Sequence, residues 1–150
     1  MWKTYMFFLL CVSPSVWATK VEPMPLKEIV RQSTQTAVAT IESVYGRTKV
    51  GAVVIQGQFR TGPGLGNVLV ARMRILRVLS GNKLHVGEVQ DLAFWPMWYM
   101  DTDLAAKIAP YPVILLLKES GAELIPVFAP TPWIDGREER EVLTQLKTAR

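Results

Sequence analysis

Few side chains in this sequence are suited to nucleophilic or metal chemistry. The 150 residues include a single histidine, His85, and a single cysteine, Cys11. A histidine acts as a general base when a nucleophile and an orienting group lie beside it, and the segment GNKLHVG around His85 offers neither. We therefore expect His85 to lie on the surface of a hairpin, and we expect no catalytic residue, no bound metal and no cofactor.

Two carboxylates lie close together in the segment MDTDL, at Asp101 and Asp103. Such a pair could hold calcium or act in acid and base catalysis. A calcium loop also needs a glycine at its bend and further oxygen ligands, which this segment does not supply. The pattern favours a helix cap or a turn.

The most unusual segment is a run of large apolar side chains at residues 94–100, FWPMWYM. Pro96 excludes a central strand because it has no backbone N–H. Aromatic rings and methionine suit a protein interface, and aromatic rings also stack on sugars. Two interpretations stay open, an exposed binding surface and a plug that closes one end of a barrel. The candidate contact residues are Trp95, Met97, Trp98 and Tyr99, with Trp133 sharing the surface.

A second candidate surface is basic. Arg72 and Arg74 alternate with apolar residues in a strand-like run, so both point to the face opposite the core. With Lys83, Arg47 and Lys49 they could form a strip that binds phosphate-bearing envelope polymers or an acidic partner. The alternative is a solvated face with surface ion pairs.

The first residues predict export. Residues 1–18 combine Lys3, an apolar run at residues 5–12 and small residues that end at Ala18, which is the order of a secretory signal peptide. A membrane anchor would need about 20 apolar residues, and Cys11 follows a bulky leucine rather than the small residue of a lipidation site. We expect cleavage after Ala18, a periplasmic location and no stable membrane anchor.

Composition limits the remaining chain to one domain. Apolar residues make up 49% and charged residues 20%, values typical of a globular protein. The formal net charge of +4 is mild, whereas a dedicated nucleic-acid binder gathers basic residues on one face. We expect residues 19–150 to form one domain without a nucleic-acid partner.

The apolar pattern predicts a mainly β (α+β) fold. Pro25 precedes a short amphipathic helix at 26–33, and Asp135 with Glu138 marks the start of a C-terminal helix. The alternation slips near Arg77, which indicates a β-bulge, and the run 114–117 is apolar at every position, as in a strand buried on both faces. Strands are predicted at 35–45, 51–58, 67–79, 86–94, 111–118 and 122–128.

Three of these segments resemble small exported bacterial OB-fold domains, which are distantly similar to netrin-like domains. The runs are PLKEIVRQSTQTAVATIESV at 25–44, RILRVLSGNKLHVGEV at 74–89 and YPVILLLKESG at 111–121. The resemblance implies an OB-like, five- to six-stranded, partly open barrel with a short N-terminal helix and a C-terminal helix. Netrin-like inhibitors place an N-terminal cysteine on a catalytic zinc, and residues 19–150 contain no cysteine, so that mechanism is not carried over.

Together these features predict a non-enzymatic periplasmic binding module that contacts an envelope protein through its aromatic loop. A carbohydrate-binding module for cell-wall or exported glycans is the first alternative. A hydrolase is disfavoured, because the sequence has one histidine and no recognisable nucleophile. The sequence does not fix the oligomeric state or the identity of the partner.

Overall fold

Two long strands of 13 residues each form the frame of the protein, β1 (Gln35–Arg47) and β4 (Val68–Ser80). Both are rich in β-branched and aliphatic residues, which pack well on a pleated surface. The computed structural model describes residues 22–55, 58–61, 64–94, 100–101 and 112–149. Over these residues the fold is mainly β, with two α-helices, as the sequence predicts.

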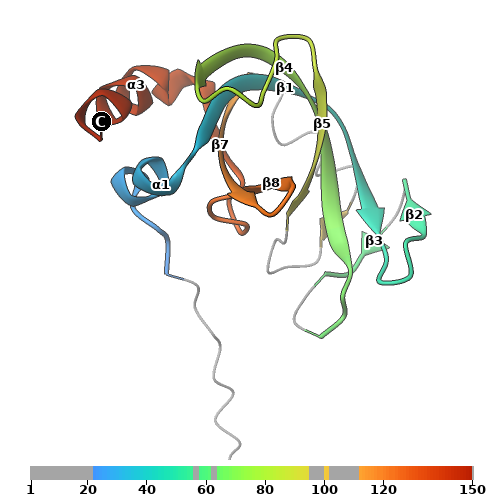
Figure 1. Ribbon diagram of the computed structural model, residues 1–150. Helices are drawn as coiled ribbons and strands as arrows, with labels where there is room; N and C mark the ends of the chain where they lie inside the picture. The colour runs from blue at the N-terminus through green and yellow to red at the C-terminus, as the bar shows by residue number, and fades with distance from the viewer. Residues whose placement is uncertain (1–21, 56–57, 62–63, 95–99, 102–111, 150) are drawn as a thin grey trace, which may run out of the picture.

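Seven antiparallel strands form one sheet that does not close on itself. Its central order is β5-β4-β1-β7-β8, while β2 pairs with β1 and β9 pairs with β7. Figure 1 shows this sheet curling round, so that β5 and β8, at its two ends, turn toward each other. The added strands have the bounds β2 (Val53–Val54), β5 (Val89–Phe94), β7 (Val113–Ser120), β8 (Glu123–Pro126) and β9 (Trp133–Asp135). A separate two-stranded sheet pairs β3 (Gln58–Phe59) with β6 (Met100–Asp101).

The curvature has a source in the pairing of β1 with β4. One residue of β4 between Ile75 and Arg77, and another between Val78 and Ser80, has no pairing partner on β1. An extra residue on one strand bends it and increases its twist. The predicted bulge around Arg77 is confirmed, and it lies where the sheet must bend.

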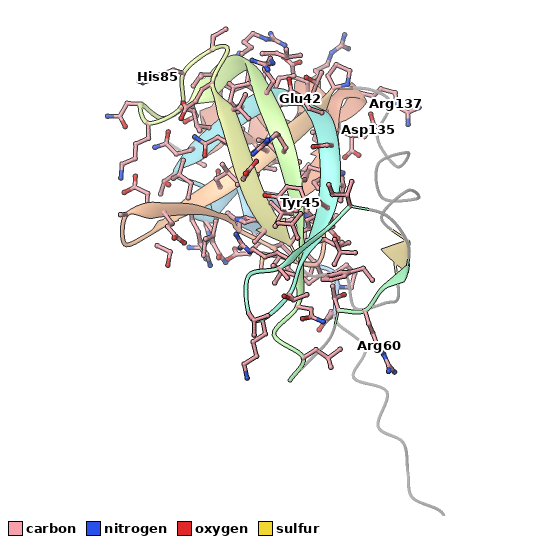
Figure 2. All side chains as sticks on the ribbon, turned by 90° about the vertical axis from the view of Figure 1, so that its right-hand side faces the viewer. Glu42, Tyr45, Arg60, His85, Asp135 and Arg137 are labelled. Carbon is pink, nitrogen blue, oxygen red and sulfur yellow. The ribbon has the colours of Figure 1, made fainter. Side chains whose placement is uncertain are left out.

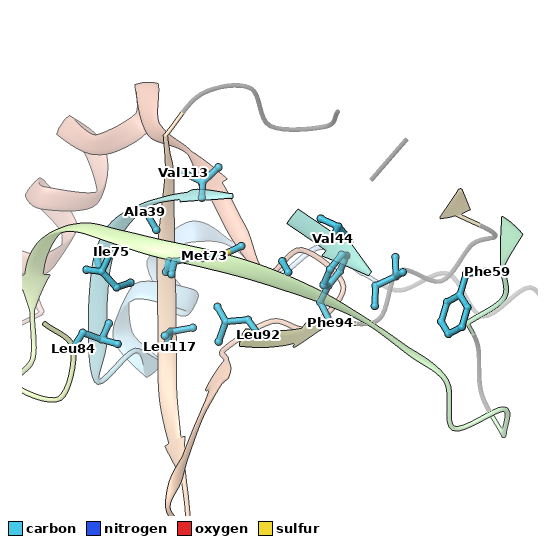
Figure 3. Packing of buried hydrophobic residues seen from close by; sticks show 14 residues of the cluster. Ala39, Val44, Phe59, Met73, Ile75, Leu84, Leu92, Phe94, Val113 and Leu117 are labelled. Carbon is cyan, nitrogen blue, oxygen red and sulfur yellow. The ribbon is translucent and has the colours of Figure 1, made fainter. Parts of the chain in front are cut away.

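Strand β7 divides the hydrophobic core into two clusters. All five residues from Val113 to Leu117 are buried, which confirms the prediction of a strand covered on both faces. Leu115 and its alternate neighbours face the inside of the curled sheet, where they meet Met73 and Leu92 (Figure 3). The residues between them, Ile114 and Leu116, face the helices.

The two helices cover the outer face of β7. Helix α1 (Leu26–Gln32) follows Pro25 as predicted and ends one residue before the expected boundary, because the Ser33 hydroxyl turns back to donate to the carbonyl of Val30. Helix α3 (Glu139–Thr148) buries Val142 against the same cluster. The Asp135 carboxylate does accept from the N–H of Arg137, but it caps a 3-10 turn at Gly136–Glu138 that precedes the helix.

The structure corrects three strand predictions. The run 51–58 is not one strand, because Val53 and Val54 pair with the end of β1, whereas β3 belongs to the second sheet. Strand β9 follows directly after Pro132 and was not expected. The run 86–94 is strand from Val89 onward, because residues before it form a turn that ends in a bulge opposite Ile75. Within the described part of the chain, no helix has both the length and the apolar character needed to cross a bilayer.

Candidate functional site

The two end strands of the sheet enclose a groove. Neighbouring strands in the order β5-β4-β1-β7-β8 are all antiparallel, so β5 and β8 run in the same direction. They approach each other without pairing and leave a hollow of about 610 Å³, here called the seam groove. Its lining residues are Arg47, Asn82, Lys83, His85, Gln90, Asp91, Ala93 and the five residues 122–126.

Strand β5 turns unpaired backbone groups toward this groove. Hydrogen-bonded and non-hydrogen-bonded residue pairs alternate along an antiparallel ladder. The N–H of Ile75 donates to the carbonyl of Glu88, so the next pair, Arg74 with Val89, is not hydrogen-bonded. In β5, the backbone N–H and C=O groups that point away from β4 therefore belong to Val89, Asp91 and Ala93. An extended segment in the groove could bond to these groups, which is how strand addition recognises a peptide backbone.

The floor of the groove carries a fixed carboxylate. Arg72 donates from Nε and Nη2 to the two carboxylate oxygens of Asp91, each at 2.9 Å, and the Tyr45 hydroxyl donates at 3.1 Å. The hydrogen bonds from Arg72 hold the pKa of Asp91 below its usual range. Burial, followed by the bond to Asp91, raises the pKa of Tyr45. Asp91 is thus anionic and oriented at neutral pH.

The rim of the groove is held by a buried glutamine. Gln35 is 2% exposed, and its side-chain oxygen accepts from the N–H of Lys83 at 3.0 Å. A Cβ on Gly81 would come within 2.0 Å of that oxygen, and Gly81 has a positive φ of 95°, so this turn requires glycine. Lys83 Nζ then reaches Glu119 at 2.6 Å, which links the β4–β5 hairpin to β7 beside the groove.

His85 lies on this rim. Its side chain is exposed, and its backbone N–H donates to Glu88 Oε2 at 2.9 Å. The expectation that His85 lies on the surface of a hairpin is confirmed. Among the described residues, no group of three or more histidine, cysteine or acidic side chains could hold a metal ion. Asp101 ends β6, and Asp103 lies outside the described residues.

The aromatic segment is described only through the residues that flank it, because Trp95, Met97, Trp98 and Tyr99 lie outside the described residues. Before it, Phe94 pairs with Leu69 at the start of β4. After it, Met100 pairs with Phe59. The chain therefore leaves and rejoins the described structure at the end of the curled sheet where β1 ends and β4 begins.

Trp133 is half-buried rather than displayed on a surface. Its ring packs edge-to-face on Phe94, with centroids 5.1 Å apart and planes at 67°, and it contacts the inner core cluster. Trp133 therefore packs on Phe94, the last described residue before Trp95. The predicted association of Trp133 with that segment is consistent with this position and stays a prediction.

The predicted basic strip is divided by ion pairing. Arg72 pairs with Asp91, and Arg74 Nε lies 2.5 Å from Glu42 Oε1 on β1 (Glu42 and Tyr45 are labelled in Figure 2). Lys83 is paired as well. Across the described ranges, Arg47 and Lys49 have no carboxylate within ion-pair distance. Arg72, Arg74 and Lys83 therefore fit the alternative of a solvated face with surface ion pairs. Arg47 and Lys49 form a separate group.

Sequence reasoning did not find the residues of β5 and β8 that line the seam groove. No local pattern marks them, because the groove exists only where strands about 30 residues apart in sequence come together. Pro126 gives a partial signal, since a proline within a strand indicates an edge. Comparisons with family models, with curated proteins and with solved structures found no match.

Proposed function

We propose that this chain is an exported, non-enzymatic binding module that takes an extended segment of an envelope protein into the seam groove. The observation that carries this proposal is the pair of sheet edges, β5 and β8, which face the same hollow without bonding to each other. Unpaired strand edges are templates for a further strand, and proteins ordinarily cover or blunt them.

The strand order also supports an OB-like barrel as the scaffold. A long first strand, β1, is shared between a β4–β5 hairpin and a β7–β8 hairpin, with a helix before it and another after the last strand. In an odd-numbered antiparallel sheet the end strands run in the same direction, so they cannot close by antiparallel pairing. The position of the groove then follows from the topology.

The lining of the groove favours a polar segment over an apolar ligand. Arg47 and Lys83 supply positive charge, and Asp91 and Glu123 supply negative charge. Leu124 and Ile125 add apolar surface between them. The hollow lies within the range of about 300–1,000 Å³ that is usual for ligand sites. The aromatic segment follows β5 directly in the sequence, and its contact with the partner stays a prediction within this proposal.

Site-specific photocrosslinking in living cells tests this proposal. A photoreactive phenylalanine analogue at Gln90 or Glu123, on opposite sides of the groove, is expected to crosslink to the same partner protein. The analogue at Lys147, exposed on α3, is the control and is expected to give no such product. Crosslinks from Gln90 and Glu123 to unrelated proteins, or none at all, would contradict the proposal.

A backbone variant sharpens the same experiment. The Ala93 N–H points away from β4, so Ala93→Pro removes a donor to the groove without removing a bond of the β4–β5 ladder. Ala93→Ser keeps that donor and serves as the matched control. We expect the crosslinked product to be lost in Ala93→Pro and retained in Ala93→Ser.

A further inference from the structure

A stretch of 45 residues, 43–87, contains no acidic residue and seven basic ones: Arg47, Lys49, Arg60, Arg72, Arg74, Arg77 and Lys83. Its first part, residues 47–67, connects β1 to β4 and contains β2 and β3. We call this part the arm. In Figures 1 and 2 it lies at the end of the molecule away from α1 and α3, with Arg60 far from His85.

The arm exposes aliphatic side chains. Seven large apolar residues in the described chain are exposed, and four of them belong to the arm. Val50 is 89% exposed, Ile55 69% and Val53 57%, and Leu65 also lies open. A few single exposed aliphatic residues are ordinary on a protein surface, but a gathering on one projection marks an interaction site.

The apex of the arm is an ordered turn rather than a loose loop. Thr48 and Ala52 bond to each other across it, because the Thr48 N–H donates to the Ala52 carbonyl at 2.9 Å and the Ala52 N–H donates to the Thr48 hydroxyl at 3.0 Å. Gly51 has a φ of 86°, which lets the chain reverse. Val50 is therefore held at the tip, pointing away from the protein, at a position that nothing in the fold requires to be apolar.

Further contacts hold the arm together, and one of them attaches it to β1. The Asn67 side chain accepts from the N–H of Lys49 at 3.1 Å and donates to the carbonyl of Arg60 at 3.0 Å, so it joins both sides of the arm. The ring of Phe59 lies against Gly46, where a Cβ would come within 2.6 Å of it. The aliphatic stem of Lys49 lies over Gly66 and leaves its amine exposed.

The cations of the arm differ from those of the barrel wall. Arg72, Arg74, Arg77 and Lys83 each meet a carboxylate from another part of the chain. For Arg47 and Lys49, no carboxylate of the described ranges lies within ion-pair distance. Both are exposed and stand next to Val50 and Val53. The charge of Arg47 still acts on Asp91 across the seam groove, whereas Lys49 has no such partner among the described residues. The arm thus combines exposed aliphatic side chains with cations that form no ion pair there.

We propose that the arm docks on the surface of an anionic phospholipid bilayer. Val50, Val53 and Ile55 enter the boundary between headgroups and acyl chains, while Arg47 and Lys49 contact the lipid phosphates. This is the arrangement of interfacial elements, in which apolar burial and attraction to anionic lipid add together. The contact is reversible, and its residues other than Arg47 lie outside the lining of the seam groove.

Charge and size favour this occupant over a protein. Lipid phosphates complement the cations of the arm that form no ion pair with the described residues, and a lipid surface imposes no shape on the arm. The exposed apolar part of the arm consists of four aliphatic side chains, a small area beside the roughly 800 Å² that each partner contributes to a stable protein interface. The tip also lacks the aromatic side chains that anchor protein interfaces.

Co-sedimentation with lipid vesicles tests the proposal. The full chain is mixed with vesicles of phosphatidylethanolamine and phosphatidylglycerol, and separately with vesicles of phosphatidylcholine alone. We expect binding to the anionic vesicles that weakens as salt rises. Lys49→Gln, which leaves the lining of the seam groove unchanged, is expected to weaken it about fivefold. Val50→Asp is expected to weaken it by about tenfold or more, because a charge replaces the most exposed aliphatic residue at the lipid boundary.

Matched variants separate the arm from the rest of the surface. Val86→Asp alters an aliphatic residue that is 69% exposed but lies outside the arm, and Lys147→Gln removes an exposed cation of α3. Both are expected to bind vesicles as the unmodified chain does. All variants share one N-terminus, so a difference between Val50→Asp and Val86→Asp reports on the arm alone.

Three results would overturn the assignment. The first is equal binding of Val50→Asp and Val86→Asp to anionic vesicles, or no binding by the unmodified chain. The second is binding to immobilised polyglutamate with none to vesicles, which would indicate an acidic protein surface instead. The third is a dimer in analytical ultracentrifugation that Val50→Asp abolishes, which would make a second copy the occupant.

Discussion

The wall of the curled sheet and the arm use the same acid-free run of sequence in opposite ways. On the wall, β4 places Arg72, Arg74 and Arg77 opposite carboxylates that come from three different elements. In the arm, Arg47 at the end of β1 and Lys49 beyond it form no ion pair with the described residues, and both stand beside exposed aliphatic side chains. Cations that are alike in the sequence therefore differ in the fold by whether a carboxylate of another element lies opposite them.

The largest contrast between the two regions concerns packing. Leu115→Ala removes a fully buried side chain from the inner cluster and is expected to lower the free energy of unfolding by about 2–5 kcal/mol. Val50→Ala in the arm is expected to change it by less than about 0.5 kcal/mol. Urea unfolding followed by circular dichroism measures both. Similar losses in the two variants would mean that the arm is part of the core.

A second substitution tests how the arm is attached. Gly46→Ala places a methyl group within 2.6 Å of the Phe59 ring, and displacing that ring is expected to cost about 1–3 kcal/mol in urea unfolding. Combining it with Phe59→Leu should recover part of the loss. Additive effects in the double variant would show that the ring and the strand do not press on each other.

Strand prediction from the sequence succeeded where burial alone decides the outcome. Every residue of 113–117 is apolar, so β7 was evident, and the slip near Arg77 gave the bulge. The run 51–58 misled because Val53, Val54 and Ile55 favour strands, yet propensity does not reveal whether a partner strand is present. Only two of its residues pair with β1.

The candidate site was less accessible to sequence reasoning. The seam groove depends on the curvature of a whole sheet, and its residues come from three strands and from the turns that precede β5 and β8. Arg72 and Arg74 were found by their alternation, but their carboxylate partners lie 19 and 32 residues away, beyond any local pattern. The acid-free run and its aliphatic residues can be read from the sequence. Their exposure on the arm is known only from the structure.

Loss of the Asn67 side chain is expected to loosen the arm without unfolding the wall. Asn67→Ala removes one bond on each side of the arm and should lower the free energy of unfolding by about 1 kcal/mol. Amide exchange of Lys49 should accelerate, while that of Leu115 stays unchanged. Equal acceleration at both amides would contradict a separately attached arm.

The smallest effect concerns the wall and depends on pH. The pKa of Asp91 is lowered by Arg72, so this pair stabilises the fold above the unfolded pKa near 4, and the contribution is lost as pH falls through the folded pKa. Asp91→Asn should lower the free energy of unfolding at pH 7 by about 0.2–1 kcal/mol, because the pair is partly exposed. The difference from the unmodified chain should shrink below pH 4. A difference that stays constant into strong acid would contradict the ion pair.

Backbone amide exchange along β5 tests the open seam most directly. If the groove is open, the N–H groups of Val89, Asp91 and Ala93 exchange fast, whereas those of Gln90, Leu92 and Phe94, bonded to β4, are protected. NMR on the isolated protein resolves the six amides one by one. An alternating pattern is the predicted result. Uniform protection of all six would mean that another strand already fills the seam and would contradict the proposed binding groove.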